Sequence, residues 1–403
     1  MTQAAVAQAP VPSHIPPHLV RDFDLFERNI TGPVHEWWDQ LHDGPDIFWT
    51  PRNGGHWVVT RYADLAHLMA DPQEFSSRHT IIPKASHAIP AIPFESDAPL
   101  HTEYRRLIAP FLAPKAIGQL EARARALIVR LLDEIQPRGH CEFINEVSLV
   151  LPIVLFMSLM DLPETDRPYL LSLGMDTVRG STLGIQKSAY AKLYAYIEAK
   201  LAERRRKPGN DILSAMLAGR VGEDGRPLNR DELVGMGVMV LGGGLDTVAS
   251  MMGFIMWHLA DNPEHRRRLI ADPKGIPAAN EEMMRRYGIS NVARVVARDV
   301  ELSGVAMSAG DMVLVATCLG GLDDRQFDQP LKVDFDRPER KSIVFGKGPH
   351  QCVGAWLARA ELRTVVETWL ARIPDFRVSD GADVISLPGK ANCVVKLPLV
   401  WDV

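Results

Sequence analysis

The amino-acid sequence predicts a mainly α-helical protein with small β-sheets, and three observations support this prediction. Apolar residues recur at helical spacing over long segments, most clearly over residues 117–135. Residues 233–260 form the longest apolar stretch and carry one charge, Asp246, which suits a long helix at the centre of a large core. Short runs with strand-type composition occur in a hairpin pattern near each end of the chain.

The first 15 residues are rich in alanine and proline, and we expect them to form a flexible lead-in. They lack the basic segment and the apolar core of a signal peptide. No repeat, low-complexity tract or break in composition marks a boundary further along the chain. We therefore expect residues 16–403 to form a single domain.

A β-hairpin is expected where residues 47–50 and 56–60 flank a tight-turn sequence. Asn53 and Gly54 supply the positive φ angles that such a turn needs. The chain then becomes largely helical, with helices expected over residues 117–135, 147–160, 185–207 and 277–287. Short strands are expected over residues 294–297 and 311–316, and a second hairpin over residues 384–387 and 393–396. The basic run at 204–207 is expected to complement the end of its helix rather than to bind a polyanion.

The stretch 233–260 is long enough to span a bilayer, but its composition favours a core helix. It contains Gly235, Gly237 and three consecutive glycines at 242–244, and the chain has no second stretch of this kind. Asn229 and Glu232 offer a capping start for the helix. Because each glycine inside a helix costs about 1 kcal/mol relative to alanine, three in a row indicate the close approach of a flat ligand.

Composition argues against some classes of function. The chain has 403 residues, of which 46% are hydrophobic and 24% charged, as in soluble globular proteins. The net charge of −5 argues against nucleic acid as the main partner. The four cysteines are far apart and form no C-x-x-C pair, which favours free thiols in a reducing compartment and hence a cytoplasmic protein.

One of these cysteines, Cys352, lies in a glycine-rich loop just before a helix expected over residues 355–363. Gly346, Gly348 and Gly354 leave little room for side chains near its sulfur, so backbone N–H groups can point at it. The positive end of the following helix favours the thiolate over the thiol. A thiolate held in this way is a nucleophile or a metal ligand; a buried cysteine in a glycine-rich turn is the alternative without such a role.

The letters around Cys352 favour the metal ligand. Residues 345–354 follow the pattern F-x-x-G-x-H-x-C-x-G, which resembles the haem-ligating loop of the cytochrome P450 superfamily, the haem-thiolate monooxygenases. The resemblance implies that Cys352 is the axial ligand of the iron of haem b, with Phe345 and His350 beside the haem. It also implies the fold of that family, a triangular prism with the haem buried between a long central oxygen-binding helix and the helix after the cysteine loop.

Thiolate ligation favours cleavage of the O–O bond, so the implied reaction is monooxygenation. Gly243-Gly244-Leu245-Asp246-Thr247 resembles the segment of the oxygen-binding helix that kinks beside the iron. This resemblance implies contact of Gly243 and Gly244 with the haem, and a proton relay to dioxygen by Asp246 and Thr247. A hydroxyl can donate to an oxygen ligand and an adjacent carboxylate can resupply the proton. Local backbone hydrogen bonds of the Asp-Thr pair are the alternative.

Four further side chains match the family's contacts to the two haem propionates. His101 and Arg105 stand four residues apart, on one face of their helix. Arg294 and His350 occupy the other two positions. Buried carboxylates need cationic or donor partners of this kind, and we expect the four to anchor the cofactor.

Glu282 and Arg285 resemble the family's E-x-x-R motif. At a spacing of three residues the two side chains share a helix face and can form an ion pair. In the family this pair is structural and contacts the segment that corresponds to residues 334–340. We therefore expect a scaffolding role and no catalytic one.

The resemblance covers residues 16–401 and is closest to the bacterial camphor hydroxylase subfamily. Members of this type take electrons from a [2Fe–2S] ferredoxin that is served by a flavin reductase. Lys341, Lys347 and Arg359 lie around the cysteine loop, where an acidic ferredoxin would dock. A solvated charged face is the alternative for these three residues.

The substrate pocket departs from that of the camphor enzyme. The loop 81–94 has no tyrosine to orient a ketone, and Gly242 and Ser290 stand where larger apolar residues are expected. These differences predict a larger, mostly apolar substrate, a terpenoid or norisoprenoid, and poor binding of camphor. The residues expected to line the pocket are Ile81, Ile89, Met239, Gly242, Ser290 and Ala391.

Three other functions remain open from the sequence. A haem peroxygenase would use the same cysteine loop but would need neither the Asp246–Thr247 relay nor a ferredoxin. A haem gas sensor would need an output domain or a DNA-binding segment, and the sequence offers neither. A membrane protein would be built on residues 233–260. The intact relay favours the oxygenase.

Overall fold

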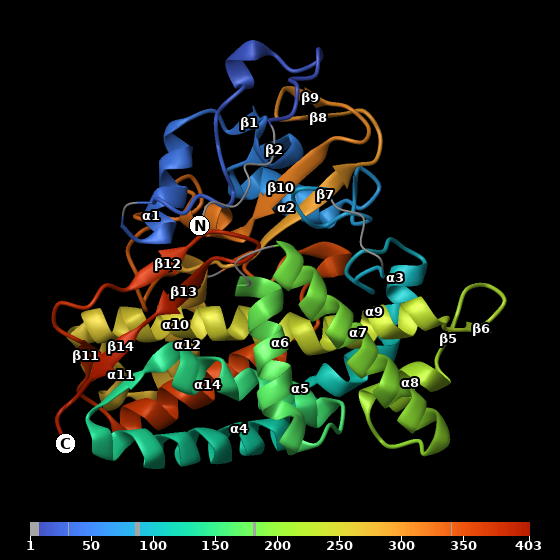
Figure 1. The fold of residues 1–403 in the computed structure, drawn as a ribbon. Coiled ribbons are helices and arrows are strands. Elements are labelled where there is room, and N and C mark those ends of the chain that lie inside the picture. Colours follow the sequence, from blue (N-terminus) through green and yellow to red (C-terminus); the bar gives the residue numbers. More distant parts are fainter. Residues whose placement is uncertain (1–7, 31, 85–88, 180–182, 340) are drawn as a thin grey trace.

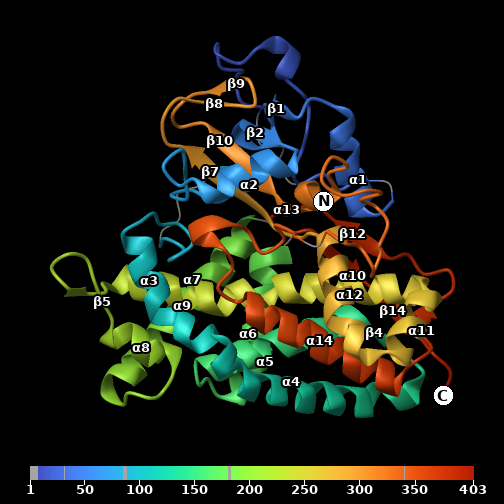
Figure 2. The ribbon, with the colours of Figure 1, turned by 180° about the vertical axis from the view of Figure 1, so that it is seen from behind.

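The computed structural model describes residues 8–30, 32–84, 89–179, 183–339 and 341–403. The molecule tapers from a broad base of long helices to a narrower end that holds the largest sheet (Figure 1). The view from behind shows the same two layers, with α10 and α14 crossing the base (Figure 2). The buried apolar residues form one cluster that runs through both layers.

The helices agree with the predicted mainly α class, and the expected helical segments are all found. They comprise α1 (Val34–Asp39), α2 (Tyr62–Ala70), α3 (Leu100–Ile108), α4 (Pro114–Ile135), α5 (Val150–Leu159), α6 (Arg167–Arg179), α7 (Leu183–Arg206), α8 (Ile212–Ala218), α9 (Arg230–Leu245), α10 (Thr247–Asp261), α11 (Pro263–Ala271), α12 (Ile276–Arg286), α13 (Thr317–Leu322) and α14 (Ala355–Arg372). The helix expected from residue 147 begins at Val150, because a π-helical turn, Ile144–Ser148, precedes it.

The largest sheet has the strand order β1-β2-β10-β7-β3. It combines three strands from residues 47–76 with two strands from residues 291–316. Its strands are β1 (Ile47–Thr50), β2 (His56–Val59), β3 (Phe75–Ser76), β7 (Asn291–Val296) and β10 (Met312–Ala316). β1 and β2 form the expected hairpin, and Asn53 and Gly54 have the positive φ angles of 52° and 88° that the turn requires. β2 pairs with β10 in parallel, whereas the other pairs are antiparallel.

The remaining strands form small sheets, of which β8 and β9 lie at the narrow end beside the largest sheet (Figures 1 and 2). They are β4 (His140–Glu142), β11 (Arg377–Val378) and β14 (Pro398–Val400) in one sheet, and the pairs β5 (Arg220–Val221) with β6 (Arg226–Pro227), β8 (Val300–Leu302) with β9 (Val305–Met307), and β12 (Ile385–Leu387) with β13 (Cys393–Lys396). The second predicted hairpin is therefore confirmed as β12 and β13. Both ribbon views place it between the sheet layer and the helical base (Figures 1 and 2).

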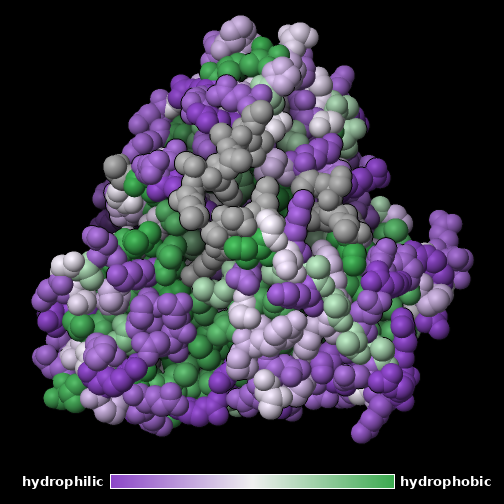
Figure 3. Space-filling view, in the orientation of Figure 1, coloured by the Kyte–Doolittle hydropathy of each residue, from purple (hydrophilic) through white to green (hydrophobic). Residues whose placement is uncertain are grey.

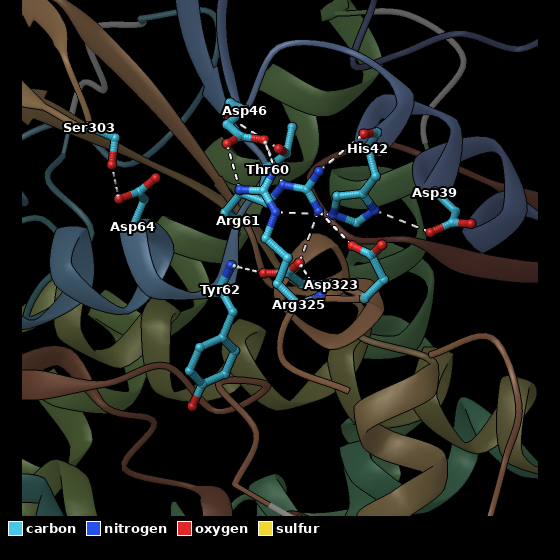
Figure 4. Close-up of polar contacts among 11 residues, drawn as sticks. Asp39, His42, Asp46, Thr60, Arg61, Tyr62, Asp64, Ser303, Asp323 and Arg325 are labelled. Carbon is cyan, nitrogen blue, oxygen red and sulfur yellow. Dashed lines mark hydrogen bonds and ion pairs between the residues drawn. The ribbon is translucent and has the colours of Figure 1, made fainter. Parts of the chain in front are cut away.

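A buried arginine joins the sheet to the end of α13. The Arg61 guanidinium donates to Asp46 at 2.7 Å, to Asp323 at 3.0 Å and to Asp324 at 2.9 Å (Figure 4). Arg325 donates to both oxygens of the Asp46 carboxylate, to Oδ2 at 2.7 Å and to Oδ1 at 3.0 Å. Because every charge in this cluster has an opposite partner, the cluster holds elements together and offers no free group for chemistry.

The long apolar stretch is broken in the middle and does not form one straight helix. α9 ends at Leu245 and α10 begins at Thr247, with Asp246 between them. The predicted capping box of Asn229 and Glu232 opens α9, with both hydrogen bonds present. In the described chain, Arg230–Asp261 is long and apolar enough to cross a membrane, but 76% of its most apolar window is buried. This burial supports the core helix and argues against the membrane span.

The described part of the expected lead-in is packed against the rest of the chain. Residues 1–7 lie outside the described chain, but Ala9 donates its N–H to the Pro51 carbonyl at 2.8 Å. Ile15 is buried in the core, and His14 pairs with Asp311 at 3.1 Å. These contacts fasten parts of the segment 8–15, and the flexibility expected for residues 1–15 stays a prediction.

The outer surface is mostly hydrophilic in the orientation of Figure 1, with hydrophobic residues in small groups (Figure 3). The basic run at the end of α7 was expected to complement the helix end. Arg204 donates instead to Asp211 at 2.7 Å and to the Asp161 carbonyl at 2.8 Å. It therefore fastens α7 to two neighbouring loops, and it binds no polyanion through this engaged guanidinium.

Candidate active site

The loop before α14 holds Cys352 in a tight backbone arrangement. The Cys352 N–H donates to the Phe345 carbonyl at 2.8 Å, and the Gly346 N–H donates to the Ile343 carbonyl at 2.8 Å. Gly346 and Gly348 have φ angles of 75° and 71°, which favour glycine. A Cβ atom on Gly348 would lie 2.6 Å from the Met69 carbonyl oxygen. The glycines therefore allow both the turn and the close approach of α2 to the loop.

The electrostatics of Cys352 differ in part from the expectation. Burial raises the pKa of its thiol, while the Gly354 N–H and the charges of Arg105 and Arg359 lower it. The loop supplies the Gly354 N–H, and α3 and α14 supply the two arginines. In the polypeptide alone, the effect of burial on the pKa of the thiol is larger than the effect of these three groups. A metal ion, which deprotonates a coordinating thiol outright, would complete the shift to thiolate.

The break in the central helix exposes a short stretch of backbone. The Thr247 hydroxyl donates to the Gly243 carbonyl at 2.8 Å. Gly242 and Gly243 are exposed, and a Cβ atom on Gly242 would meet no atom within 4 Å. Asp246 is buried, and its carbonyl accepts the Ser250 N–H at 2.8 Å. The segment thus presents small residues and a hydroxyl at the kink, as the motif predicted.

Gly244 also has a packing role in the structure. It was expected to be small so that a flat ligand could approach. In the structure a Cβ atom on Gly244 would lie 1.7 Å from the ring of Phe156 on α5. The missing side chain therefore allows α5 to pack against α9, and of the three consecutive glycines it is Gly242 and Gly243 that leave space for a ligand.

The four predicted anchoring side chains converge from three elements. His101 and Arg105 come from α3, Arg294 from β7, and His350 from the cysteine loop. The imidazole rings of His101 and His350 stack with their centroids 3.8 Å apart. Burial and the neighbouring positive charges lower the pKa of His101 to about 4 and of His350 to about 3. Burial also lowers the pKa of Arg294 to about 10.

This cluster has an excess of positive charge that suits an acidic cofactor. His101 Nε2 is buried, and it has no hydrogen-bond partner in the described part of the chain. The Arg294 guanidinium is buried and donates to the carbonyl of its own neighbour, Ala293, at 2.8 Å. Two carboxylates, such as haem propionates, would supply the missing partners. The residues present therefore fit a haem, whose propionates this cluster would hold and whose iron Cys352 would bind.

Comparisons with known proteins support this assignment. The family model described as cytochrome P450 matches residues 167–276 and 276–384. A probable cytochrome P450 127A1 from Sinorhizobium fredii is 33% identical over 404 residues, which cover 97% of each chain. The chain belongs to the cytochrome P450 family.

Solved P450 structures agree with the fold over nearly the whole chain. The crystal structure of CYP101C1 has a TM-score of 0.90 and 34% identity, and covers 98% of this chain and all of its own length. The crystal structure of CYP101J2 has a TM-score of 0.88 and 35% identity, with 97% of this chain and all of that one covered. The predicted resemblance to the camphor-type P450 subfamily is confirmed, and so is the P450 fold.

The E-x-x-R pair of this P450 is buried and fully engaged. Arg285 donates to Glu282 at 2.9 and 2.8 Å, and Arg337 donates to the same carboxylate at 3.0 Å. The remaining Arg285 donors reach the carbonyls of Gly321, Pro330 and Lys332. The expected contact with the segment 334–340 is present, apart from residue 340, which lies outside the described chain. This geometry supports the scaffolding role.

The residues expected to line the substrate pocket come from the β7 bridge, from α9 and from the loop 81–94. Ser290 and Ala391 form an isolated β-bridge, which joins the start of β7 to the turn between β12 and β13. Ile89 packs on α9, where a Cβ atom on Gly235 would lie 3.2 Å from it. Met239 and Gly242 lie on α9. Ile81 is half-buried in the loop 81–94, and residues 85–88 of this loop lie outside the described chain.

The residues expected to dock a ferredoxin differ in their surroundings. Lys341 and Lys347 are exposed as predicted. Arg359 is held by Glu281 at 2.5 and 3.1 Å, and its guanidinium covers the Phe345 ring at 4.3 Å. Its charge is therefore matched within the molecule, and its contact with a ferredoxin stays a prediction.

Sequence analysis missed an exposed tryptophan on the same face. The Trp356 side chain, on the first turn of α14, is 58% exposed. The Arg359 guanidinium lies 6.0 Å from the centre of the Trp356 ring, and tryptophan and arginine are both enriched at contacts between proteins. The signal was available in the sequence, because position 356 follows the cysteine by four residues, and the helical repeat places it on the outer face of α14.

Proposed function

We propose that this P450 monooxygenase binds haem b and hydroxylates a terpenoid or norisoprenoid of small to medium size with electrons from a [2Fe–2S] ferredoxin. The observation that carries the proposal is the unbalanced cluster of His101, Arg105, Arg294 and His350, which lies close enough to Cys352 for the Arg105 charge to act on its thiol. When bound, the haem supplies the oxygen-activating redox chemistry. The chain's own residues bind, orient and supply protons.

Each group has a distinct proposed role. Cys352 would hold the iron, and the cationic cluster would hold the propionates and fix the orientation of the ring. Thr247 would place a hydroxyl proton at the reacting side, and Asp246 would restore that proton from the protein interior. Gly242 leaves room for the substrate, because a Cβ atom there would meet no atom within 4 Å.

The names of two relatives support oxygenation but do not identify the class of substrate. Proteins named pentalenic acid synthase, from Streptomyces avermitilis, and vitamin D(3) 25-hydroxylase, from Pseudonocardia autotrophica, are each 30% identical to this chain. They cover 90% and 82% of it. The proposal of an apolar substrate rests on Gly242, Ile89 and the neighbouring core residues. The proposed setting is the bacterial cytoplasm, where such a ferredoxin and its flavin reductase would be available.

The first experiment is an absorption spectrum of the purified protein, reduced and exposed to carbon monoxide. A strongly red-shifted Soret band would establish thiolate ligation through Cys352. A band typical of histidine ligation, or no haem at all, would overturn the proposal. The Cys352→His variant should lose the red-shifted band, whereas the Cys318→Ser variant, which changes a buried cysteine outside the loop, should keep it.

The source of electrons is tested separately. Turnover with a [2Fe–2S] ferredoxin and its flavin reductase should exceed turnover with hydrogen peroxide. Support by peroxide alone would favour the peroxygenase.

Camphor should produce a smaller spin-state shift than a larger bicyclic or cyclohexenyl terpenoid does, and a complete shift with camphor would contradict the proposed substrate class.

A further inference from the structure

We propose that the substrate of this enzyme carries a carboxylate at the end remote from the reacting carbon, and that Lys390 binds it. This inference rests on the proposed function, because it names the substrate class of the same site. It refines the mostly apolar substrate expected from the sequence into an apolar body with an anionic head.

The position of Lys390 is fixed by the backbone at the wall of the expected pocket. Lys390 lies in the turn between β12 and β13, and its carbonyl accepts the Asn291 N–H at 3.1 Å. The next residue, Ala391, forms a β-bridge with Ser290. Lys390 therefore stands at the start of β7, the strand that carries the cofactor-anchoring Arg294 three residues further on.

The Lys390 side chain is accessible yet surrounded by protein. The residue is exposed, but burial lowers the pKa of its ammonium group. A side chain in a recess can be reached by solvent and still be surrounded by protein atoms. A lysine on the outer surface would also be exposed, but burial would not lower its pKa. Cys352 shows the same combination, since it is exposed while burial raises the pKa of its thiol.

Glu95 lies close enough to Lys390 for its charge to act on the ammonium group. Its negative charge opposes the lowering of the pKa of Lys390, and it raises the pKa values of Tyr190 and Tyr194 on α7 together with burial. Glu95 accepts hydrogen bonds from the Thr80 hydroxyl at 3.3 Å and from the Ala91 N–H at 3.2 Å. Lys390 and the two phenols therefore approach Glu95 from separate elements.

Backbone contacts tie the loop that carries Glu95 to β7. The Ala293 N–H donates to the Thr80 carbonyl at 2.8 Å, two residues beyond the contact between Asn291 and Lys390. Glu95 and Lys390 are therefore both fastened to the first half of the same strand. They flank it from the loop before α3 and from the turn between β12 and β13.

The charge balance of the recess favours an anionic head group. No ion pair of Lys390 is recorded within 4.0 Å among the residues that the structure describes. An ammonium group in a desolvated setting gains most from a carboxylate at hydrogen-bond distance. Tyr190 and Tyr194 offer hydroxyl donors nearby, and Gly242 and Ile89 are left for the apolar body of the ligand.

The competing explanation is that Lys390 and Glu95 attract each other across the recess and contact no substrate. In that case Lys390 would matter equally for charged and neutral ligands. The two explanations separate when ligands of the same shape differ in the head group alone.

The experiment uses the haem-loaded enzyme at pH 7.5 and matched pairs of acid and alcohol. The probes are perillate with perillyl alcohol, and geranate with geraniol. Binding is measured by the spin-state shift of the Soret band and by titration calorimetry. The wild type should bind at least one acid more tightly than its alcohol. The Lys390→Met variant should lose about 10- to 100-fold in affinity for that acid and less than threefold for the alcohol.

Three further variants complete the test. Lys390→Arg should retain most of the preference for the acid, and Glu95→Gln should increase it by removing a competing negative charge. Lys396→Met, which changes an exposed lysine on β13 of the same hairpin, should leave both affinities unchanged.

The inference is overturned if neither acid binds more tightly than its alcohol, or if Lys390→Met weakens acid and alcohol equally. Either result leaves the proposed monooxygenase in place, provided that the reduced protein shows the red-shifted band with carbon monoxide. Loss of that band would instead count against the proposed function.

Discussion

The Thr247 hydroxyl donates a 2.8 Å hydrogen bond to the Gly243 carbonyl across the break between α9 and α10. This is a local bond from a side chain to the backbone, four residues back along the chain. It also holds the hydroxyl at the kink, beside the buried Asp246. The same contact thus stabilises the bend and positions the group proposed to deliver a proton.

Replacement of Thr247 by alanine should separate oxygen consumption from product formation. We expect product per NADH oxidised to fall about 10- to 100-fold, because the positioned hydroxyl is lost, while the spectrum with carbon monoxide stays unchanged. The Thr247→Ser variant keeps the hydroxyl and should retain most of the product yield. Equal yields for the alanine variant and the wild type would exclude the proposed role of Thr247.

Replacement of Gly244 by alanine should destabilise the fold rather than block the cofactor. The new Cβ atom would overlap the Phe156 ring, and overpacking of a core typically costs about 1–3 kcal/mol. Gly243→Ala is the matched control, because the nearest atom to its Cβ would be Met239 Cε at 3.9 Å. Unfolding in urea measures both variants. The Gly244→Ala/Phe156→Leu double variant should recover part of the loss, and no recovery would contradict the packing explanation.

Replacement of Glu282 by glutamine should be strongly destabilising. It removes the charge that Arg285 and Arg337 share in the core, and an uncompensated buried charge costs about 3–5 kcal/mol. The exposed pair of Arg268 and Asp336 provides the control, since Asp336→Asn should cost less than about 1 kcal/mol. The free energies of unfolding in urea give the comparison. Similar values for the two variants would show that the buried pair is not a scaffold.

Acid should destabilise the protein through His258. Burial lowers the pKa of this imidazole to about 3, and His258 Nε2 lies 2.8 Å from His265 Nδ1. Between pH 6.5 and 3 the unfolded chain therefore binds a proton that the folded chain does not, so stability falls as pH decreases through this range. Melting temperatures at pH 7.5 and 5.0 should differ less for His258→Gln than for the wild type. His140→Gln, on an exposed histidine, should keep the full difference.

The sequence predicted the elements that depend on local spacing. The turn at Asn53 and Gly54, the capping box of Asn229 and Glu232, and the pair of Glu282 and Arg285 each join residues that lie close along the chain. Their geometry follows from local backbone and helix rules, so the structure agrees with the predictions at these positions.

The features that the sequence did not predict depend on partners far along the chain. Phe156 gives Gly244 its packing role, and Glu281 engages Arg359 from a position 78 residues away. Packing of this kind is set by tertiary structure, which spacing within one segment does not encode. The surroundings of Lys390 could not be predicted from the sequence for the same reason. A single lysine in a turn is usually a surface residue, and only the tertiary structure shows which groups lie near it.

The parallel pairing of β2 with β10 has a consequence for how the protein is made. The Trp57 indole of β2 donates to Asp311, 254 residues later in the chain. At synthesis rates of about 5–20 residues per second, the first hairpin leaves the ribosome roughly 13–50 s before its partner strand exists. During that interval one edge of β2 has no strand to bind, and unpaired edges promote association between chains. Yield in the cell should therefore respond to chaperone supply and to temperature during expression, even when the finished enzyme is stable.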